Sequence, residues 1–159
     1  MPKAVVPFNA FRLSIPDNWV DRSIYTFVAP SRTSSLESSP LTIDIPEQTF
    51  RPNLVVTCEN ERVADLAGYV RQQWQESGRA LPELTLVREG ALTLDGRPAF
   101  QRVFSFLAQG TTVVQRQVFL LVDGLAYALT FSSLPEAFDQ DDRELFEPFI
   151  TRLSFVKEP

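Results

Sequence analysis

The side chains that most often carry out chemistry are scarce in this chain. The sequence contains no histidine and a single cysteine, Cys58, and its lysines, Lys3 and Lys157, lie near the two ends. Without histidine there is no imidazole base, no Ser-His or Cys-His pair and no imidazole metal ligand. Lysines placed at the termini disfavour a Ser-Lys dyad or a Schiff base. Glu59 follows Cys58 directly and does not favour the thiolate, so we expect a buried, inert cysteine.

Sites for phosphate, calcium and other anions are poorly supported as well. The glycines are at least six residues apart, so no glycine-rich phosphate loop exists. The aspartates between positions 139 and 142 lack the glycine and the spacing of a calcium loop, and acids at the start of a helix explain them better. Scattered arginines could form an anion site only if they converged, and they are more often solvated or paired. These arginines are Arg12, Arg22, Arg102 and Arg116. We therefore expect no enzyme activity, no metal and no cofactor.

Length and charge narrow the class of protein further. A chain of 159 residues fits one domain, here residues 1–159, with a core that needs no disulfide. The 15 basic and 20 acidic side chains give a net charge of −5, which argues against nucleic acid as a partner. Pro7 ends the first apolar run before it reaches the length of a signal peptide, and the run at residues 118–122 is too short to span a bilayer. We expect a soluble cytoplasmic protein that is not itself a membrane protein.

Hydrophobic periodicity predicts the elements that this domain contains. Residues 11–15, 24–28 and 54–58 have the pattern of short strands, and residues 41–45 are a weaker candidate. A helix is expected after Asn60 as N-cap, with Gly78 just past its end. The apolar face of this helix would consist of Val63, Leu66, Ala67, Val70 and Trp74.

The second half of the chain favours a meander of longer strands. Residues 84–94, 99–108, 112–122 and 125–131 are separated by Asp-Gly or Gln-Gly pairs, which are typical of tight hairpin turns. A second amphipathic helix is expected over residues 145–153, kinked or begun by Pro148. The order predicts an α+β domain, a mainly antiparallel sheet with helices packed on one face.

The second face of this sheet is not convincingly polar. In residues 113–122, one set of alternating side chains includes Val114, Val118 and Leu120, and the other includes Phe119 and Leu121. Because apolar patches of this size rarely face water, something is expected to cover them. The candidates are a second copy of the chain, residues 31–52 folding back, or a hydrophobic ligand.

Several segments together resemble the Eag chaperones of bacterial type VI secretion, which belong to the DcrB-like group with a Mog1/PsbP-like fold. The first is the Ile-Pro-Asp-x-Trp turn at residues 15–19 followed by Asp-Arg-Ser-Ile at 21–24. The others are Gly68-Tyr69-Val70 with Gln73, Leu81-Pro82, the run Asp95-Gly96-Arg97-Pro98-Ala99 and the strand Arg116-Gln117-Val118-Phe119. Their order and spacing cover most of the chain, and no single motif is strongly specific.

The resemblance implies a homodimeric cytoplasmic chaperone that shields the hydrophobic N-terminal transmembrane helices of a PAAR- or Rhs-type effector before export. It would place Ile24, Thr26 and Val55 on a concave apolar surface, although the family commonly has an aliphatic residue at position 26. Gln73 and Gln117 would offer hydrogen bonds to the bound helices. A helix destined for lipid satisfies its own backbone, so the protein that holds it needs area more than chemistry.

Other interpretations of the same residues remain. Ile24 and Val55 are ordinary strand residues that more often belong to a core, and Gln73 and Gln117 could simply be polar edge residues. A non-catalytic scaffold or a hydrophobic-ligand carrier on a PsbP-like fold is the alternative function, because a fold does not fix a function.

Overall fold

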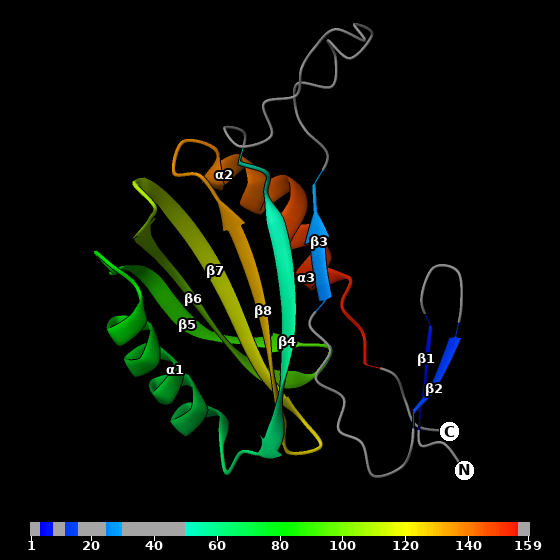
Figure 1. Cartoon of the computed structure of the whole chain (residues 1–159). Coiled ribbons are helices and arrows are strands. Elements are labelled where there is room, and N and C mark those ends of the chain that lie inside the picture. Colours follow the sequence, from blue (N-terminus) through cyan, green and yellow to red (C-terminus); the bar gives the residue numbers. More distant parts are fainter. Residues whose placement is uncertain (1–3, 8–11, 16–24, 30–49, 156–159) are drawn as a thin grey trace, which may run out of the picture.

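The computed structural model describes residues 4–7, 12–15, 25–29 and 50–155 (Figure 1). Strands β1 and β2 form a small antiparallel pair, and six further strands form the main sheet. The strands are β1 (Ala4–Pro7), β2 (Arg12–Ile15), β3 (Tyr25–Val28), β4 (Asn53–Arg62), β5 (Thr85–Leu94), β6 (Arg97–Ala108), β7 (Thr111–Val122) and β8 (Leu125–Ser133). The helical segments are α1 (Leu66–Ala80), α2 (Phe138–Asp141), the π-helical turn η2 (Asp142–Phe146) and α3 (Glu147–Thr151). None of the helices in these residues is long and apolar enough to cross a membrane.

The main sheet has the order β3-β4-β8-β7-β6-β5, and every neighbouring pair is antiparallel. This confirms the α+β class and the meander of β5 to β8. The hairpin turns lie where the sequence places them. Asp95 and Gly96 both have positive φ, 46° and 77°, as the tight turn between long twisted strands requires. The weak strand candidate at residues 41–45 lies outside the described residues.

Helices lie on both faces of this sheet, so the expectation that they pack on one face is wrong. Phe119 of β7 packs with Tyr69 and Val70 of α1, whereas the next residue back, Val118, packs in the cluster that contains Phe146 and Ile150. Since successive strand residues point to opposite faces, α1 and the α2–α3 run must cover different sides, as Figure 1 also shows. Both faces of β7 are apolar, and each needs its own helical layer.

Helix α1 begins later than its sequence pattern indicates. Asp65, not Asn60, is the N-cap, and its Oδ1 atom accepts a 2.6 Å hydrogen bond from the Gly68 N–H. Asn60 instead belongs to β4, which continues to Arg62 through a register irregularity. Gly78 lies inside the helix rather than beyond its end.

An arginine beneath α1 fixes the helix on the sheet. Arg102 of β6 is 4% exposed, and its guanidinium donates to the Val70 carbonyl oxygen at 3.3 Å. The same guanidinium lies 4.6 Å from the Trp74 ring centroid and bonds Glu89 at 3.0 Å. Trp74 in turn packs edge-on against Phe104. A buried charge is tolerated here because a carboxylate, a carbonyl and an aromatic face all surround it.

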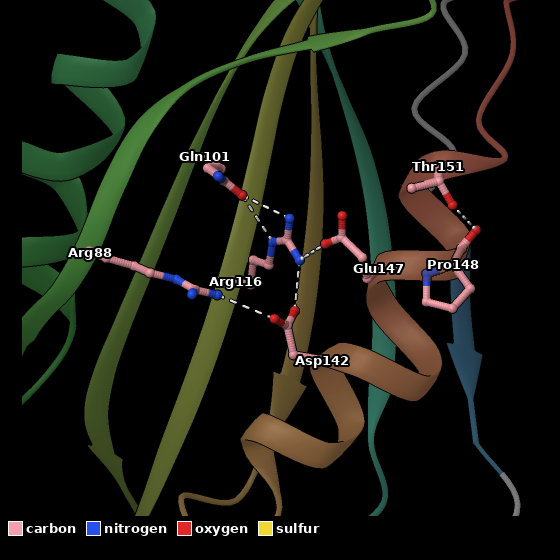
Figure 2. Close-up of polar contacts among 7 residues, drawn as sticks. All are labelled: Arg88, Gln101, Arg116, Asp142, Glu147, Pro148 and Thr151. Atoms are coloured by element: carbon pink, nitrogen blue, oxygen red, sulfur yellow. Dashed lines mark hydrogen bonds and ion pairs between the residues drawn. The ribbon is translucent and has the colours of Figure 1, made fainter.

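The C-terminal helical run is fixed to the other face by a second buried arginine (Figure 2). Arg116 of β7 is 4% exposed and donates to Asp142 and Glu147, both at 2.7 Å. Gln101 accepts two more of its hydrogen bonds, at 3.1 and 2.8 Å. Burial acts to lower the pKa of Arg116, but hydrogen bonds with Glu147 and Asp142 outweigh it and raise that pKa above its usual value. The run starts at Phe138, earlier than predicted, and Pro148 falls in the first turn of α3.

Candidate functional site

The part of the α1-side face that lies over β3, β4, β8 and β7 brings together three of the residues expected to bind a partner. Thr26 is the register partner of Val55, Val55 of Thr130, and Thr130 of Gln117. Register partners in antiparallel strands share a face, so these four side chains form one row across four strands. The Gln117 amide donates to the Thr130 hydroxyl at 3.3 Å. We use the name sheet groove for this open sheet surface, which also includes Thr57 on the same face of β4.

Gln73, the fourth described residue of the predicted site, lies on α1 beside this surface. It lines a cavity of about 600 Å³ between the start of α1 and the end of β4. Its amide donates to Glu76 at 3.4 Å, and Gln72 donates to the other oxygen of the same carboxylate at 3.2 Å. Ile24, the remaining predicted residue, lies outside the described residues.

The limits of the sheet groove follow from the packing of its neighbours. At β6 the row continues with Arg102, the register partner of Gln117, which is already covered by α1. At the other end β3 is the edge strand, and Thr26 is exposed. Val55, Gln117 and Thr130 are partly exposed. Within the described ranges, α1 therefore bounds this surface on one side and the sheet edge bounds it on the other.

The side chains of the groove are less apolar than the sequence analysis expects. Val55 lies between two threonines, one glutamine follows, and no large aliphatic or aromatic residue stands in the described row. The strongly exposed Phe27 and Phe149 belong to the opposite side, since Phe27 pairs in register with Leu54 of the other core cluster. The site thus offers short methyl-bearing side chains together with hydrogen-bonding groups.

Two ionisable groups, Tyr69 and Cys58, lie near this region. Burial raises the pKa of the Tyr69 hydroxyl above its usual value, and the charge of Glu59 and its hydrogen bond at 3.4 Å add to the effect. Tyr69 is thus held as a neutral phenol. Cys58 is partly exposed, not buried as predicted, because it lies near the end of β4 where the ladder becomes irregular. Its thiol donates to the Glu59 carbonyl oxygen at 3.4 Å.

Sequence reasoning missed Thr130 and the role of Arg102. Thr130 stands between Ala128 and Ser132 in a strand face of small residues, which has no distinctive signal by itself. Arg102 stands between Phe100 and Phe104 on the same face of the strand. A charged residue in such an apolar face could have indicated a buried, paired arginine. Arg102 and Arg116 lie on opposite faces, so these two arginines do not converge on one anion site.

A sequence model of the DcrB family matches residues 12–151, which is most of the chain. The chain belongs to the DcrB family. This confirms the DcrB-like part of the resemblance. A comparison with curated proteins gives no match.

One solved structure shares the fold of this DcrB-family chain. The crystal structure of PA94, a protein of unknown function from Pseudomonas aeruginosa, has a TM-score of 0.76 and 20% identity over 98% of both chains. Cyanobacterial PsbP (CyanoP) from Synechocystis sp. PCC 6803 is similar at a TM-score of 0.45 and 16% identity, over 60% of this chain and 62% of that one. LpqN, involved in cell envelope biogenesis of Mycobacterium tuberculosis, has a TM-score of 0.42 and 18% identity over 78% of each chain. The first similarity shows a shared fold, and the other two are weaker.

Proposed function

We propose that this DcrB-family protein is a non-catalytic chaperone of the Eag type, which binds the hydrophobic N-terminal transmembrane helices of a PAAR- or Rhs-type effector before export. The observation that carries the proposal is the convergence of Thr26, Val55 and Gln117 in one row, beside the helix that presents Gln73. These residues were selected by the family resemblance alone, and they are far apart in the sequence.

The width of the sheet groove suits one transmembrane helix. Strands lie about 4.8 Å apart, so the row from Thr26 to Gln117 spans roughly 14 Å, and a helix is about 10–12 Å wide. Strand β4 has 10 residues, but Glu59 already bonds Tyr69 of α1, so only residues 53–57 lie clear of that helix. They extend about 17 Å at ~3.3 Å per residue, roughly half of the ~30 Å of a bilayer-spanning helix. About half of one such helix can therefore rest on this part of β4, with α1 beside it.

The side chains of the groove suit a membrane helix better than a partner that binds through apolar contacts alone. Transmembrane helices associate through close packing of small residues and through hydrogen bonds from Ser, Thr, Asn and Gln side chains. Val55 and the threonine methyl groups provide shallow apolar contact, and Gln117 and Thr130 provide donors and acceptors. The surface thus imitates the packing that the helix would find in a bundle.

If each groove holds one helix, the number of helices in the effector sets the number of chaperone subunits that are needed. An effector region with two or more transmembrane helices would need two such surfaces, which a homodimer supplies. The homodimer is part of the proposal and is tested together with capture.

Co-expression with the N-terminal hydrophobic segment of a PAAR or Rhs effector encoded beside the gene tests the proposal. The segment should become soluble and co-purify with the wild-type protein in a complex that contains two copies of the chaperone. Recovery of the segment only as insoluble material, with and without the protein, would contradict it.

Two neighbouring residues of the edge strand provide a matched pair of variants. Thr26 and Phe27 are both exposed and face opposite sides of the sheet. Thr26→Asp should weaken capture at least tenfold, because it places a carboxylate against an apolar helix, whereas Phe27→Asp should leave capture within about twofold. Equal effects of the two variants, with both proteins folded, would contradict binding in the sheet groove.

A further inference from the structure

The opposite face of the sheet contains a second apolar site, unrelated to the groove. A cavity of about 690 Å³ lies between the sheet and the C-terminal helical run. This volume falls within the range of about 300–1,000 Å³ that is typical of small-molecule sites. Its floor consists of side chains from three strands: Val56, Leu120, Val122, Tyr127 and Leu129.

Helix and tail residues form the other walls of this cavity. Leu145 and Phe149, one helical turn apart, are 40% and 42% exposed, although their neighbours Phe146 and Ile150 are buried in the core. Leu153 and Phe155 enclose the remaining side. The tail is fixed in this place, because the Phe155 N–H donates to Asp95 at 3.0 Å and the Arg97 guanidinium lies 4.5 Å from the Phe155 ring centroid. The cavity is therefore built by three separate parts of the fold.

A smaller cavity adjoins this one along the seam between helix and sheet. A second apolar cavity of about 300 Å³, near Phe27 and Phe131, shares Leu145 and Phe149 with the first. An elongated apolar seam suits a flexible chain better than a compact ring system.

Two charged side chains, Glu144 and Arg152, lie at the rim of the larger cavity, and they differ in their bonding partners. Glu144 accepts hydrogen bonds from Gln140 at 3.2 and 3.3 Å. Arg152, at the end of α3, has no ion pair or side-chain hydrogen bond with the residues that the structure describes. Gln140 is a neutral amide and does not neutralise Glu144, so the rim carries one carboxylate and one guanidinium. The walls are complementary to an alkyl chain, and of the two charged groups only Arg152 can form a charge-assisted bond with a ligand carboxylate.

We propose that this cavity binds an unesterified fatty acid, with the alkyl chain between α3 and the sheet and the carboxylate at Arg152. The proposal gives a site and a ligand class to the carrier function, and it does not depend on the sheet groove.

Binding can be tested with the full chain after removal of bound lipid. The probe is 11-(dansylamino)undecanoic acid, whose emission rises in an apolar site, and dodecanoate is the competitor at concentrations below its micellar range. We expect saturable binding of one probe per chain and displacement by dodecanoate. Dodecyltrimethylammonium, with the same chain and the opposite charge, should compete at least tenfold more weakly. Absence of saturable binding, or equal competition by both surfactants, would overturn the proposal.

Three variants distinguish this cavity from non-specific surface binding. Arg152→Glu should weaken dodecanoate at least fivefold and leave the uncharged competitor dodecanol within twofold. Leu145→Asp should weaken all ligands at least tenfold, whereas Leu86→Asp, a leucine of matched exposure (42% against 40%) on β5, should change nothing. Urea unfolding verifies that each variant is folded. Wild-type affinities in folded Arg152→Glu and Leu145→Asp would show that the ligand binds elsewhere.

Discussion

Gln117 and Thr130 face each other across β7 and β8, and the glutamine amide donates to the threonine hydroxyl at 3.3 Å. The pair is partly exposed at the end of the sheet groove that adjoins α1, so each group keeps capacity for a further hydrogen bond. Because the two side chains bond each other and remain partly exposed, a polar pair is tolerated on two central strands of the sheet.

Replacement of this amide separates binding from folding. Gln117→Leu should change the free energy of unfolding by less than about 1 kcal/mol, because one neutral hydrogen bond contributes about that much. Capture of the effector segment should weaken by roughly three- to tenfold, since a bond to the bound helix is lost. Gln140→Leu, on the exposed surface of α2, is the control and should retain full capture. A large loss of stability in Gln117→Leu would assign the residue to the core instead.

Arg116→Met should destabilise the protein by about 2 kcal/mol in urea unfolding. The substitution removes charge-assisted bonds to Asp142 and Glu147, and the two carboxylates then have to rely on water and on Arg88. Arg88→Met removes a bond from a side chain that is 57% exposed, so its effect should remain within ~0.5 kcal/mol. Similar urea midpoints for the two variants would show that Arg116 does not anchor the helical run.

The raised pKa of Tyr69 predicts a loss of stability in alkali. Above the usual tyrosine value of 10.0 the unfolded chain releases this proton and the folded chain retains it. Rising pH therefore favours unfolding, by up to about 1.4 kcal/mol per pH unit for this group. Tyr69→Phe should flatten the decline of the unfolding free energy between pH 10 and 12, and it should differ from wild type by less than about 1 kcal/mol at pH 7. Parallel curves for the two proteins would refute this assignment.

Two glycines should respond to alanine with opposite signs. Gly96 has a φ of +77° in the β5–β6 turn, so Gly96→Ala should lower stability by about 1–2 kcal/mol through backbone strain alone. Gly78 lies in α1, and Gly78→Ala should raise stability by about 0.5 kcal/mol. Neither new Cβ has a heavy atom within 4 Å, so packing does not confuse the comparison of thermal midpoints.

The sequence allowed the long strands and their turns to be predicted because each carries a local signal. Alternating apolar residues and the Asp-Gly pair at 95–96 define β5 and β6 to within two residues. The first residue of α1 was harder to predict from the sequence. Asn60 and Asp65 are both suitable caps, and the choice depends on how far β4 pairs with β8, which is a tertiary property.

The placement of helices and of the binding row also depends on long-range pairing. Both faces of β7 are apolar, which indicates two covering layers but not which helix supplies each one. Val55 and Gln117 lie in one row only because β8 pairs with both of their strands. Thr130 of β8 is the register partner of each and therefore lies between them. The family resemblance selected Thr26, Val55 and Gln117, and the structure added Thr130 between Val55 and Gln117.

Photocrosslinking tests the chaperone account most directly. Benzoylphenylalanine placed at Thr57 reports from the sheet groove, and placed at Phe149 it reports from the opposite side. The account predicts that the effector segment is crosslinked from position 57 and not from position 149. Crosslinking from position 149 with none from position 57, in a soluble complex, would contradict it.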